Sequence, residues 1–426
     1  MVAEQVGNPT KGRWFIAGAA VLLQLALGAV YAWSVFSKAL QRDNAFHVTK
    51  AVAAIPFSVT IGMIFLGTFL GGRVQDKRGP RVVALTGGII YTIGILIAGL
   101  ASGRSQYWVL VLGYGVIAGF GLGVGYIVPI AMLQKWFPDK RGLITGIAVG
   151  GFGFGAVITS PIAQQLVDHY TRVPTRSFLW LGLGYLVLIL LGTSAFRNPP
   201  AGYAVPGWQA RTTGRAIAGT RDYSPAEALR TPQWYLLAAI LTLNVTAGIA
   251  LISVAASAAS DIAGYSSAAA ATLTGVMGVF NGAGRIFWGA VSEWTGRMIA
   301  FVAMLAIQGI CFLILPHASS AALFAILAAL VYLCYGGGFG TMPAAAADFY
   351  GTPNAGAIYG AMIVAWSIGG VVGPLIAASL YESSGGYTLP FTVIGIIAAL
   401  AVALPLVTKA PSAPRTAEAA VSARRS

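Results

Sequence analysis

Twelve apolar runs, each long enough to cross a lipid bilayer, follow one another along this chain of 426 residues. A membrane-spanning helix needs about 20 apolar residues, because the hydrocarbon core is about 30 Å thick. Charged residues make up only 9% of the chain, whereas a soluble chain carries roughly 25%. The sequence therefore excludes a water-soluble fold and predicts an all-α integral membrane protein with twelve transmembrane helices.

The apolar runs form two sets of six, separated by a polar stretch that holds five arginines between residues 197 and 230. We expect an N-terminal six-helix bundle, a cytoplasmic linker, a C-terminal six-helix bundle and a disordered cytoplasmic tail, at residues 1–196, 197–231, 232–408 and 409–426. The expected spans lie, to within several residues, near 14–40, 52–73, 82–101, 107–133, 143–167, 177–196, 232–258, 268–292, 298–316, 320–347, 355–381 and 388–407.

The net charge of +14 comes from basic residues that lie between the apolar runs. On a soluble chain such a charge would point to nucleic acid, but here it indicates topology and contact with anionic lipid. Of the 26 Lys and Arg residues, 19 fall on one set of alternate connections and six on the other. Because positive charge is retained inside the cell, we expect a multi-pass protein of the inner (plasma) membrane with both termini in the cytoplasm. The one remaining cation is Arg285.

A short pattern recurs after the second expected helix of each set. Residues 72–81 read GRVQDKRGPR and residues 289–297 read GAVSEWTGR, so that the two copies lie 217 residues apart. Glycine allows a tight turn between two helix ends, and the acid can bond a neighbouring helix N-terminus or pair with a base. The pattern predicts a parallel internal repeat and a cytoplasmic conformational latch formed by Asp76, Arg81, Glu293 and Arg297.

With this repeat, the whole chain resembles the major facilitator superfamily. Four further segments are similar to the group of oxalate/formate antiporters and monocarboxylate transporters: YAWSVF from Tyr31, KWFPDKRG from Lys135, ALRTPQW from Ala228 and FNGAGRIFWG from Phe280. The resemblance implies two six-helix bundles that alternate between an outward-open and an inward-open form. It also implies transport of a small monocarboxylate such as L-lactate, as in bacterial homologues of the monocarboxylate transporters.

Arg285 is the strongest candidate for binding a substrate. It lies eight residues before Glu293, so at 1.5 Å per residue its Cα is ~12 Å along the helix from the turn. A cation this deep costs at least ~2.5–3.5 kcal/mol and should face an aqueous cavity and an anion. Asp261 and Asp348 are the internal acids that could pair with it. We favour a substrate carboxylate, which the planar guanidinium binds through two parallel bonds, and the family resemblance assigns substrate binding to the matching arginine.

Asn281 precedes Arg285 by one helical turn on the same face. It can bond the same ligand, or it can form an ordinary hydrogen bond between helices, and the sequence leaves both readings open. In animal monocarboxylate transporters the matching residue resembles a proton-carrying aspartate. The amide at this position therefore puts proton transfer by Asn281 in doubt.

Asp261 is the one acid in the long apolar region between residues 232 and 287. An acid at or near the membrane is a candidate proton carrier, although it can equally be an exposed acid at a helix end. Because arginine does not titrate usefully, proton coupling needs Asp261, another group, or a substrate that travels with its proton.

Several side chains can enclose a short organic acid at the middle of the spans, or can instead belong to the core. Tyr335 and Phe339 are four residues apart on one helix face, and the family resemblance places an aromatic pair there; the other candidates are Tyr31, Tyr126 and Leu27. The same resemblance aligns Trp366 with a second cation of the oxalate/formate antiporters. A site with one arginine and no second cation favours a substrate with one negative charge over a substrate with two.

The remaining residues give no reason to expect an enzyme, a cofactor or a metal site. Three histidines lie in separate loop regions, two cysteines lie inside apolar segments, and the glycine runs lack the lysine of a phosphate-binding loop. We therefore expect a monomeric carrier of a lactate- or pyruvate-like monocarboxylate in symport with protons. The alternatives are an organic-anion exchanger of the oxalate/formate type and a membrane sensor that does not transport.

Overall fold

The computed structural model describes residues 9–139, 141–200, 203–205, 222–351 and 354–411. The expected linker and the expected tail fall partly outside these ranges. Every regular element within them is helical.

The helices before the linker are α1 (Pro9–Gly28), η1 (Ala29–Ala32), α2 (Trp33–Leu40), α3 (Lys50–Arg78), α4 (Pro80–Gly99), η2 (Arg104–Gln106), α5 (Tyr107–Leu110), the π-helical η3 (Val111–Ala118), α6 (Gly119–Trp136), α7 (Arg141–His169), η4 (Pro174–Arg176) and α8 (Ser177–Ser194). We call this part the first half. The short α9 (Pro225–Ala228) lies near the end of the expected linker. It is followed by α10 (Pro232–Ala263), α11 (Ser267–Thr295), α12 (Arg297–Ile314), η5 (Leu315–His317), α13 (Ala321–Tyr350), α14 (Ala355–Met362), α15 (Val364–Ser384), α16 (Thr388–Ala401) and α17 (Ala403–Val407). We call this part the second half.

Eleven helical segments in the described ranges are long and apolar enough to cross a membrane. The helix missing from this set is α11, which is 29 residues long but falls short of the others in apolar content. Its sequence includes Asn281 and Arg285, together with several threonines and serines. The one long helix outside this set, among the described residues, is therefore the helix in which the sequence predicts the substrate site.

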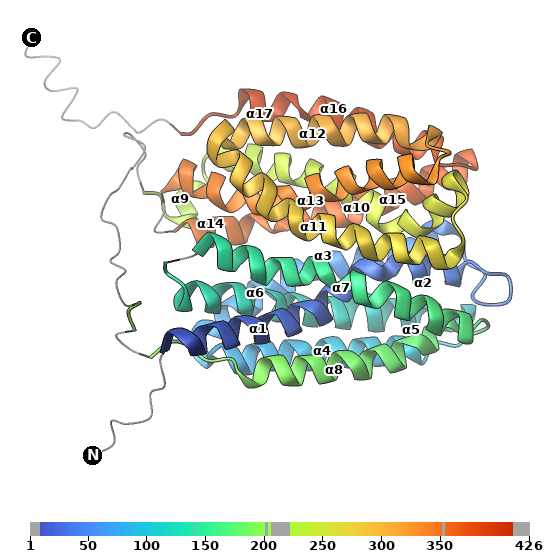
Figure 1. The fold of residues 1–426 in the computed structure, drawn as a ribbon, viewed down its shortest axis with the longest axis horizontal. Helices are drawn as coiled ribbons and strands as arrows, with labels where there is room; N and C mark the ends of the chain where they lie inside the picture. The colour runs from blue at the N-terminus through green and yellow to red at the C-terminus, as the bar shows by residue number, and fades with distance from the viewer. Residues whose placement is uncertain (1–8, 140, 201–202, 206–221, 352–353, 412–426) are drawn as a thin grey trace, which may run out of the picture.

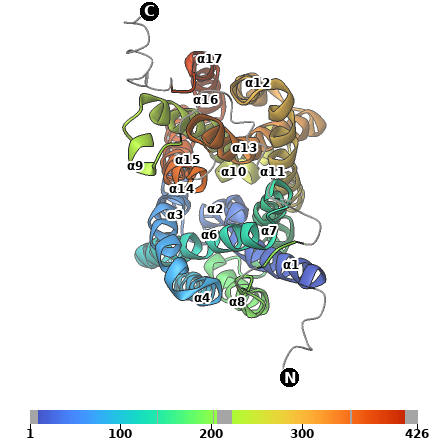
Figure 2. The ribbon, with the colours of Figure 1, turned by 90° about the vertical axis from the view of Figure 1, so that its left-hand side faces the viewer.

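The helices of each half gather into a separate group, as Figure 2 shows in an end-on view. Between the groups, α3 packs against α15 and α7 packs against α11. In Figure 1 the start of α1 and the end of α17 lie at the same end of the molecule, on the left. We call this the terminal end and the opposite one, where α2 and α10 finish, the distal end.

Both copies of the repeated sequence pattern form the same turn. The helix α3 ends at Gly79, which has φ +80°, and α11 ends at Gly296, which has φ +93°. Only glycine takes this backbone conformation without strain. Each turn leads directly into the next helix, α4 or α12, so the tight turn predicted from the repeated sequence is present twice at the terminal end.

The first span is interrupted at its centre. Between α1 and α2 the backbone tightens into the short η1, which contains Tyr31. Just before it, Gly28 lies so close to α7 that a Cβ atom built on it would meet the backbone oxygen of Phe152 at 1.8 Å. This approach of two helices brings Tyr31 and Phe152 together in the middle of the molecule.

Candidate functional site

Arg285 and Asn281 are buried on the inner face of α11, where Arg285 is 4% exposed and Asn281 is 0% exposed. All three guanidinium nitrogens and both polar atoms of the amide lack a hydrogen-bond partner among the described residues. Leaving such groups unpaired costs about 1–3 kcal/mol each, and more for a charged group. The pair is thus a buried set of donors and a carbonyl oxygen that are available to a ligand.

The two acids that could have neutralised Arg285 pair elsewhere. Asp261 accepts from Lys50 at 2.8 Å, and Asp348 accepts from Arg297 at 3.0 Å. The guanidinium instead lies over the aromatic ring of Phe339, whose centroid is 5.0 Å from its central carbon. A cation–π contact of this kind is favourable but does not replace a counter-ion.

Close packing of α13 sets the position of the pair. A Cβ atom on Gly336 would lie 2.0 Å from the backbone oxygen of Asn281, and one on Gly340 would lie 2.1 Å from that of Arg285. Two glycines one turn apart allow the helix backbones to touch. The backbone of α11 is therefore held against α13 at the two residues that carry the unpartnered side chains.

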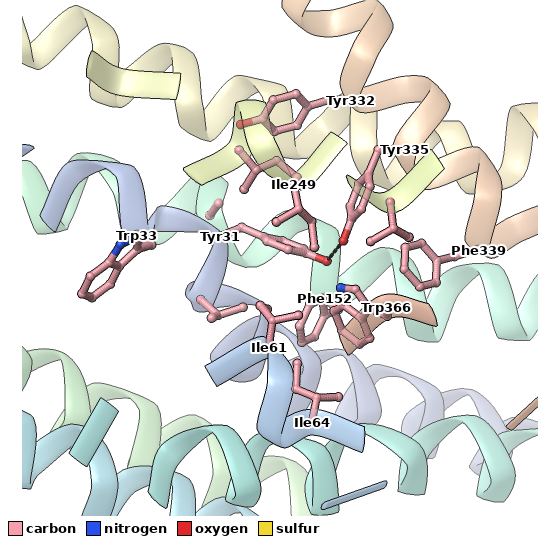
Figure 3. Close-up of a cluster of buried hydrophobic side chains, with 14 of the residues drawn as sticks. Tyr31, Trp33, Ile61, Ile64, Phe152, Ile249, Tyr332, Tyr335, Phe339 and Trp366 are labelled. Carbon is pink, nitrogen blue, oxygen red and sulfur yellow. Dashed lines mark hydrogen bonds between the residues drawn. The ribbon is translucent and has the colours of Figure 1, made fainter. Parts of the chain in front are cut away.

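Aromatic side chains from both halves meet in a buried cluster (Figure 3), and one of them, Phe339, lies against the guanidinium of Arg285. The hydroxyls of Tyr31 and Tyr335 share a hydrogen bond of 2.7 Å that joins the two halves. Phe339 packs edge-on against Tyr335, with ring centroids 5.4 Å apart. Leu27, also predicted for the pocket wall, is buried and packs against Gly125 of α6.

Two members of this aromatic cluster were absent from the predicted set. Phe152 contacts both Tyr31 and Tyr126, with centroid distances of 5.2 and 5.1 Å. Trp366 contacts Tyr126 and Phe339, each at 5.3 Å, and is fully buried. Phe152 lies within a glycine run that indicates only helix packing, whereas the alignment of Trp366 with a family ligand position was a usable signal.

Asp261 lies apart from the cluster, near the distal end of α10, and its side chain is 42% exposed. Besides Lys50, it accepts a hydrogen bond from the Tyr381 hydroxyl at 3.2 Å. The ammonium group of Lys50 also lies 3.2 Å from the centroid of the Tyr381 ring. Because Lys50 belongs to the first half, this cluster links the two halves.

Other hydrogen bonds between the halves also lie toward the distal end. Lys38 of α2 donates to Ser260 at 2.6 Å, and the backbone nitrogen of Ala51 donates to Glu382 at 2.8 Å. Ion pairs at the terminal end, by contrast, join residues of the same half, as Arg13 does with Asp139 at 2.7 Å. The described polar contacts therefore close the distal end more firmly than the terminal end.

The predicted latch residues occupy the terminal end. Arg297 donates to Asp348 of α13 and to Ser292 of its own turn. Glu293 and Arg81 are exposed. The side chain of Asp76 lies outside the described residues. The contact that the structure shows at this turn thus joins α12 to α13 through Arg297 and Asp348.

The arrangement suits binding of an anion more than bond-making chemistry. In the described ranges, no group of three or more His, Cys, Asp or Glu residues could hold a metal ion. The buried groups at the centre are one permanent cation, one amide and neutral aromatic rings, of which three carry hydroxyls and one an indole N–H. They can bind a carboxylate and enclose a small apolar body.

Comparison with known proteins gives one family. The family model described as Major Facilitator Superfamily matches residues 14–373 and 239–426. The oxalate:formate antiporter of Oxalobacter formigenes is 26% identical over 402 residues, which cover 92% of this chain and 90% of that one. Monocarboxylate transporter 13 of Rattus norvegicus is 25% identical over 401 residues, or 91% and 87% of the two chains.

A solved structure shares the fold. It is a bacterial homologue of the human lysosomal transporter Spinster, in an inward-facing and occupied conformation, with a TM-score of 0.70. The match covers 94% of this chain and 97% of the other at 14% sequence identity.

Proposed function

The chain belongs to the major facilitator superfamily, whose members are membrane transporters rather than enzymes, and on that premise we propose that it carries a small monocarboxylate in symport with protons. The substrate in this proposal is lactate- or pyruvate-like, and it crosses by alternating access between the two halves. The observation that carries the proposal is Arg285, a buried cation without an acid partner among the described residues.

A carboxylate can satisfy both the charge and the geometry of Arg285. Its two oxygens match the planar guanidinium fork, and charge-assisted bonds of this type are about twice as strong as neutral ones. Asn281, one turn away, adds a further donor to the same ligand. One cation balances one negative charge, which favours a monoanion over a dianion such as oxalate.

The relatives support the class of substrate. One is named for oxalate and formate, and another is named a monocarboxylate transporter. The aromatic rings and Leu27 supply apolar surface for a short carbon chain. We therefore assign substrate binding to Arg285, Asn281, Tyr31, Tyr126, Tyr335, Phe339 and Leu27.

Proton coupling is assigned to Asp261. Protonation would remove the negative charge that binds Lys50 and would weaken the contact between the halves at the distal end. Because the carboxyl is partly exposed there, protons can reach it from solution. A monoanion that moves with one proton transfers no net charge, so that a pH gradient can drive its uptake.

The distribution of basic residues supports the orientation that we propose. The connections at the terminal end carry most of the Lys and Arg residues, which places both chain ends in the cytoplasm of a cell whose inner (plasma) membrane holds the protein. The distal end then faces the outside. We propose that the monomer transports, because the site takes its residues from a single chain.

Uptake of radiolabelled L-lactate into liposomes that contain the purified protein tests the proposal. We expect accumulation under an inward proton gradient and its loss when a protonophore is added. Uptake that ignores the gradient but needs lactate or oxalate inside would indicate exchange and would remove the role of Asp261. Binding without any transport would indicate a sensor.

The variant Arg285→Lys tests the substrate site. It keeps the charge but loses the planar fork, so we expect the KM for lactate to rise at least about tenfold. Arg104→Lys, at an exposed arginine in η2, is the matched control and should transport like the wild type. Unchanged lactate transport by the folded Arg285→Lys variant would refute the assignment.

A further inference from the structure

The indole N–H of Trp366 is a buried donor that the carboxylate site described above does not use. Trp366 lies in the first turn of α15 and is fully buried. Its Nε1 has no acceptor among the described residues. Since an indole can donate but not accept, only a ligand or water oxygen or a ring face can satisfy it.

Its surroundings distinguish Trp366 from the other buried indoles that lack an acceptor, Trp234 and Trp288. Those two pack edge-on against the neighbouring rings of Tyr235 and Phe287. The ring of Trp366 instead touches Tyr126, Phe152 and Phe339, at centroid distances of 5.3, 5.7 and 5.3 Å. Trp366 therefore belongs to the same cluster that surrounds Arg285.

The direction of the donor follows from the close-up. In Figure 3 the nitrogen of Trp366 lies on the side of the ring that faces the hydroxyls of Tyr31 and Tyr335. The adjacent residue, Ser367, donates to the backbone oxygen of Ile61 at 2.9 Å. This bond ties the first turn of α15, which carries Trp366, to α3.

The donors at the site exceed what a carboxylate alone needs. The guanidinium and amide of α11 suffice for its two oxygens. In addition, the Tyr31 and Tyr335 hydroxyls are joined by one bond, so that one of their two protons remains free to donate. With the indole N–H, this makes two donors beyond those of α11.

We infer that the Trp366 N–H donates to an oxygen on the α-carbon of the substrate, and that the site thereby selects 2-hydroxy and 2-oxo monocarboxylates over unsubstituted short-chain acids. The inference rests on the proposed function and adds to it the group that distinguishes lactate and pyruvate from propionate. A site built to bond a substrate oxygen leaves its own buried donor unpaired when an analogue lacks that oxygen. Propionate should therefore bind about tenfold more weakly than lactate or pyruvate.

The experiment measures inhibition of L-lactate counterflow by unlabelled lactate, pyruvate and propionate in liposomes. Trp366→Phe keeps an aromatic ring and removes the N–H. We expect the ratio of the propionate to the lactate inhibition constant to fall from about ten toward one in this variant. The control is Trp33→Phe, because the Trp33 indole donates to the backbone oxygen of Ala53 at 3.1 Å, away from the site; its ratio should remain that of the wild type.

Two results would overturn the inference while leaving the proposed function intact. One is equal inhibition by propionate and lactate in the wild type, which needs no variant to fold. The other is a Trp366→Phe variant that weakens all three acids by the same factor, because the ring would then only pack. Absence of any lactate counterflow in the wild type would instead overturn the proposed function, and the inference with it.

Discussion

At the scale of single residues, the proposed site depends on the neutrality of Asn281. The side chains at positions 281 and 285 lie one turn apart on the inner face of α11, where residues four apart are neighbours. An amide there leaves the full positive charge of Arg285 for a ligand. A carboxylate in its place would supply that charge with a permanent partner.

The variant Asn281→Asp tests this reasoning. We expect an internal ion pair with Arg285 that competes with the substrate, so that the KM for lactate at neutral pH rises about tenfold or more. Lactate uptake into liposomes across a range of concentrations measures it. A KM equal to that of the wild type would mean that the two side chains do not share a ligand.

The sequence singled out the charged and amide residues of the proposed site because each is rare in an apolar helix. Aromatic residues are common in this chain, so their number says little about which of them turn inward. Phe152 and Trp366 show this limit, since each is buried in the cluster but neither belonged to the predicted binding set. The face that a ring presents depends on helix rotation, which packing decides.

At the scale of helices, the site depends on how closely α11 and α13 approach. The glycines at 336 and 340 place the α13 backbone against that of α11 at Asn281 and Arg285. The approach fixes the rotation of α11 and hence the direction of its polar side chains. Close packing of this kind, rather than the hydrophobic effect, drives helix association inside a membrane.

Gly340→Ala should disturb this contact. The added Cβ would lie 2.1 Å from a backbone oxygen, so the helices must separate at a cost of about 1–3 kcal/mol. We expect a lower thermal unfolding temperature in detergent and weaker lactate transport. Gly289→Ala is the control on α11, because the nearest atom to its Cβ is 3.8 Å away. Equal stability of the two variants would contradict the proposed packing.

The helices were largely predictable, but their interruptions were not. The lengths of the apolar runs predicted the order of the spans, and the repeated motif predicted the two turns at Gly79 and Gly296. The break at η1 carries no proline and no charge that would have predicted it. It coincides with the contact of Gly28 on α7, which involves residues far apart in the sequence.

At the scale of the whole molecule, the consecutive helices η1 and α2 of the first half carry a row of contacts to the second half. Tyr31, Ser34 and Lys38 follow one another at helical spacing and bond Tyr335, Thr274 and Ser260 in turn. The row runs from the proposed substrate site to the distal end, where Lys50 and Asp261 continue it. Asp261 was visible in the sequence as an isolated acid, but its partner, 211 residues away, was not.

Asp261→Asn should favour the form that is open at the distal end. A partly exposed ion pair contributes about 0.2–1 kcal/mol to the closed form. Its loss should therefore raise the ratio of the form open at the distal end to the closed form by up to about fivefold. The reporter is Ser34→Cys, buried between the halves, and the measurement is its rate of labelling by a membrane-impermeant thiol reagent. We expect faster labelling in the Asp261→Asn background.

The control for this measurement is Asp168→Asn, which breaks a similar exposed pair with Arg42 inside the first half. It should leave the labelling rate unchanged. The two native cysteines are buried, and their labelling without the reporter gives the background. Equal rates in both variants would show that the pair does not hold the halves together.

The 217-residue offset between the two glycine turns relates Arg285 of α11 to Thr68 of α3. Thr68 satisfies its hydroxyl within its own helix, by donating to the backbone oxygen of Ile64. Of the two related positions, the one in the second half therefore carries a charged group that can bind the substrate, whereas the one in the first half does not. On the proposed assignment, the substrate stays bound to the second half while the first half moves relative to it in each transport cycle.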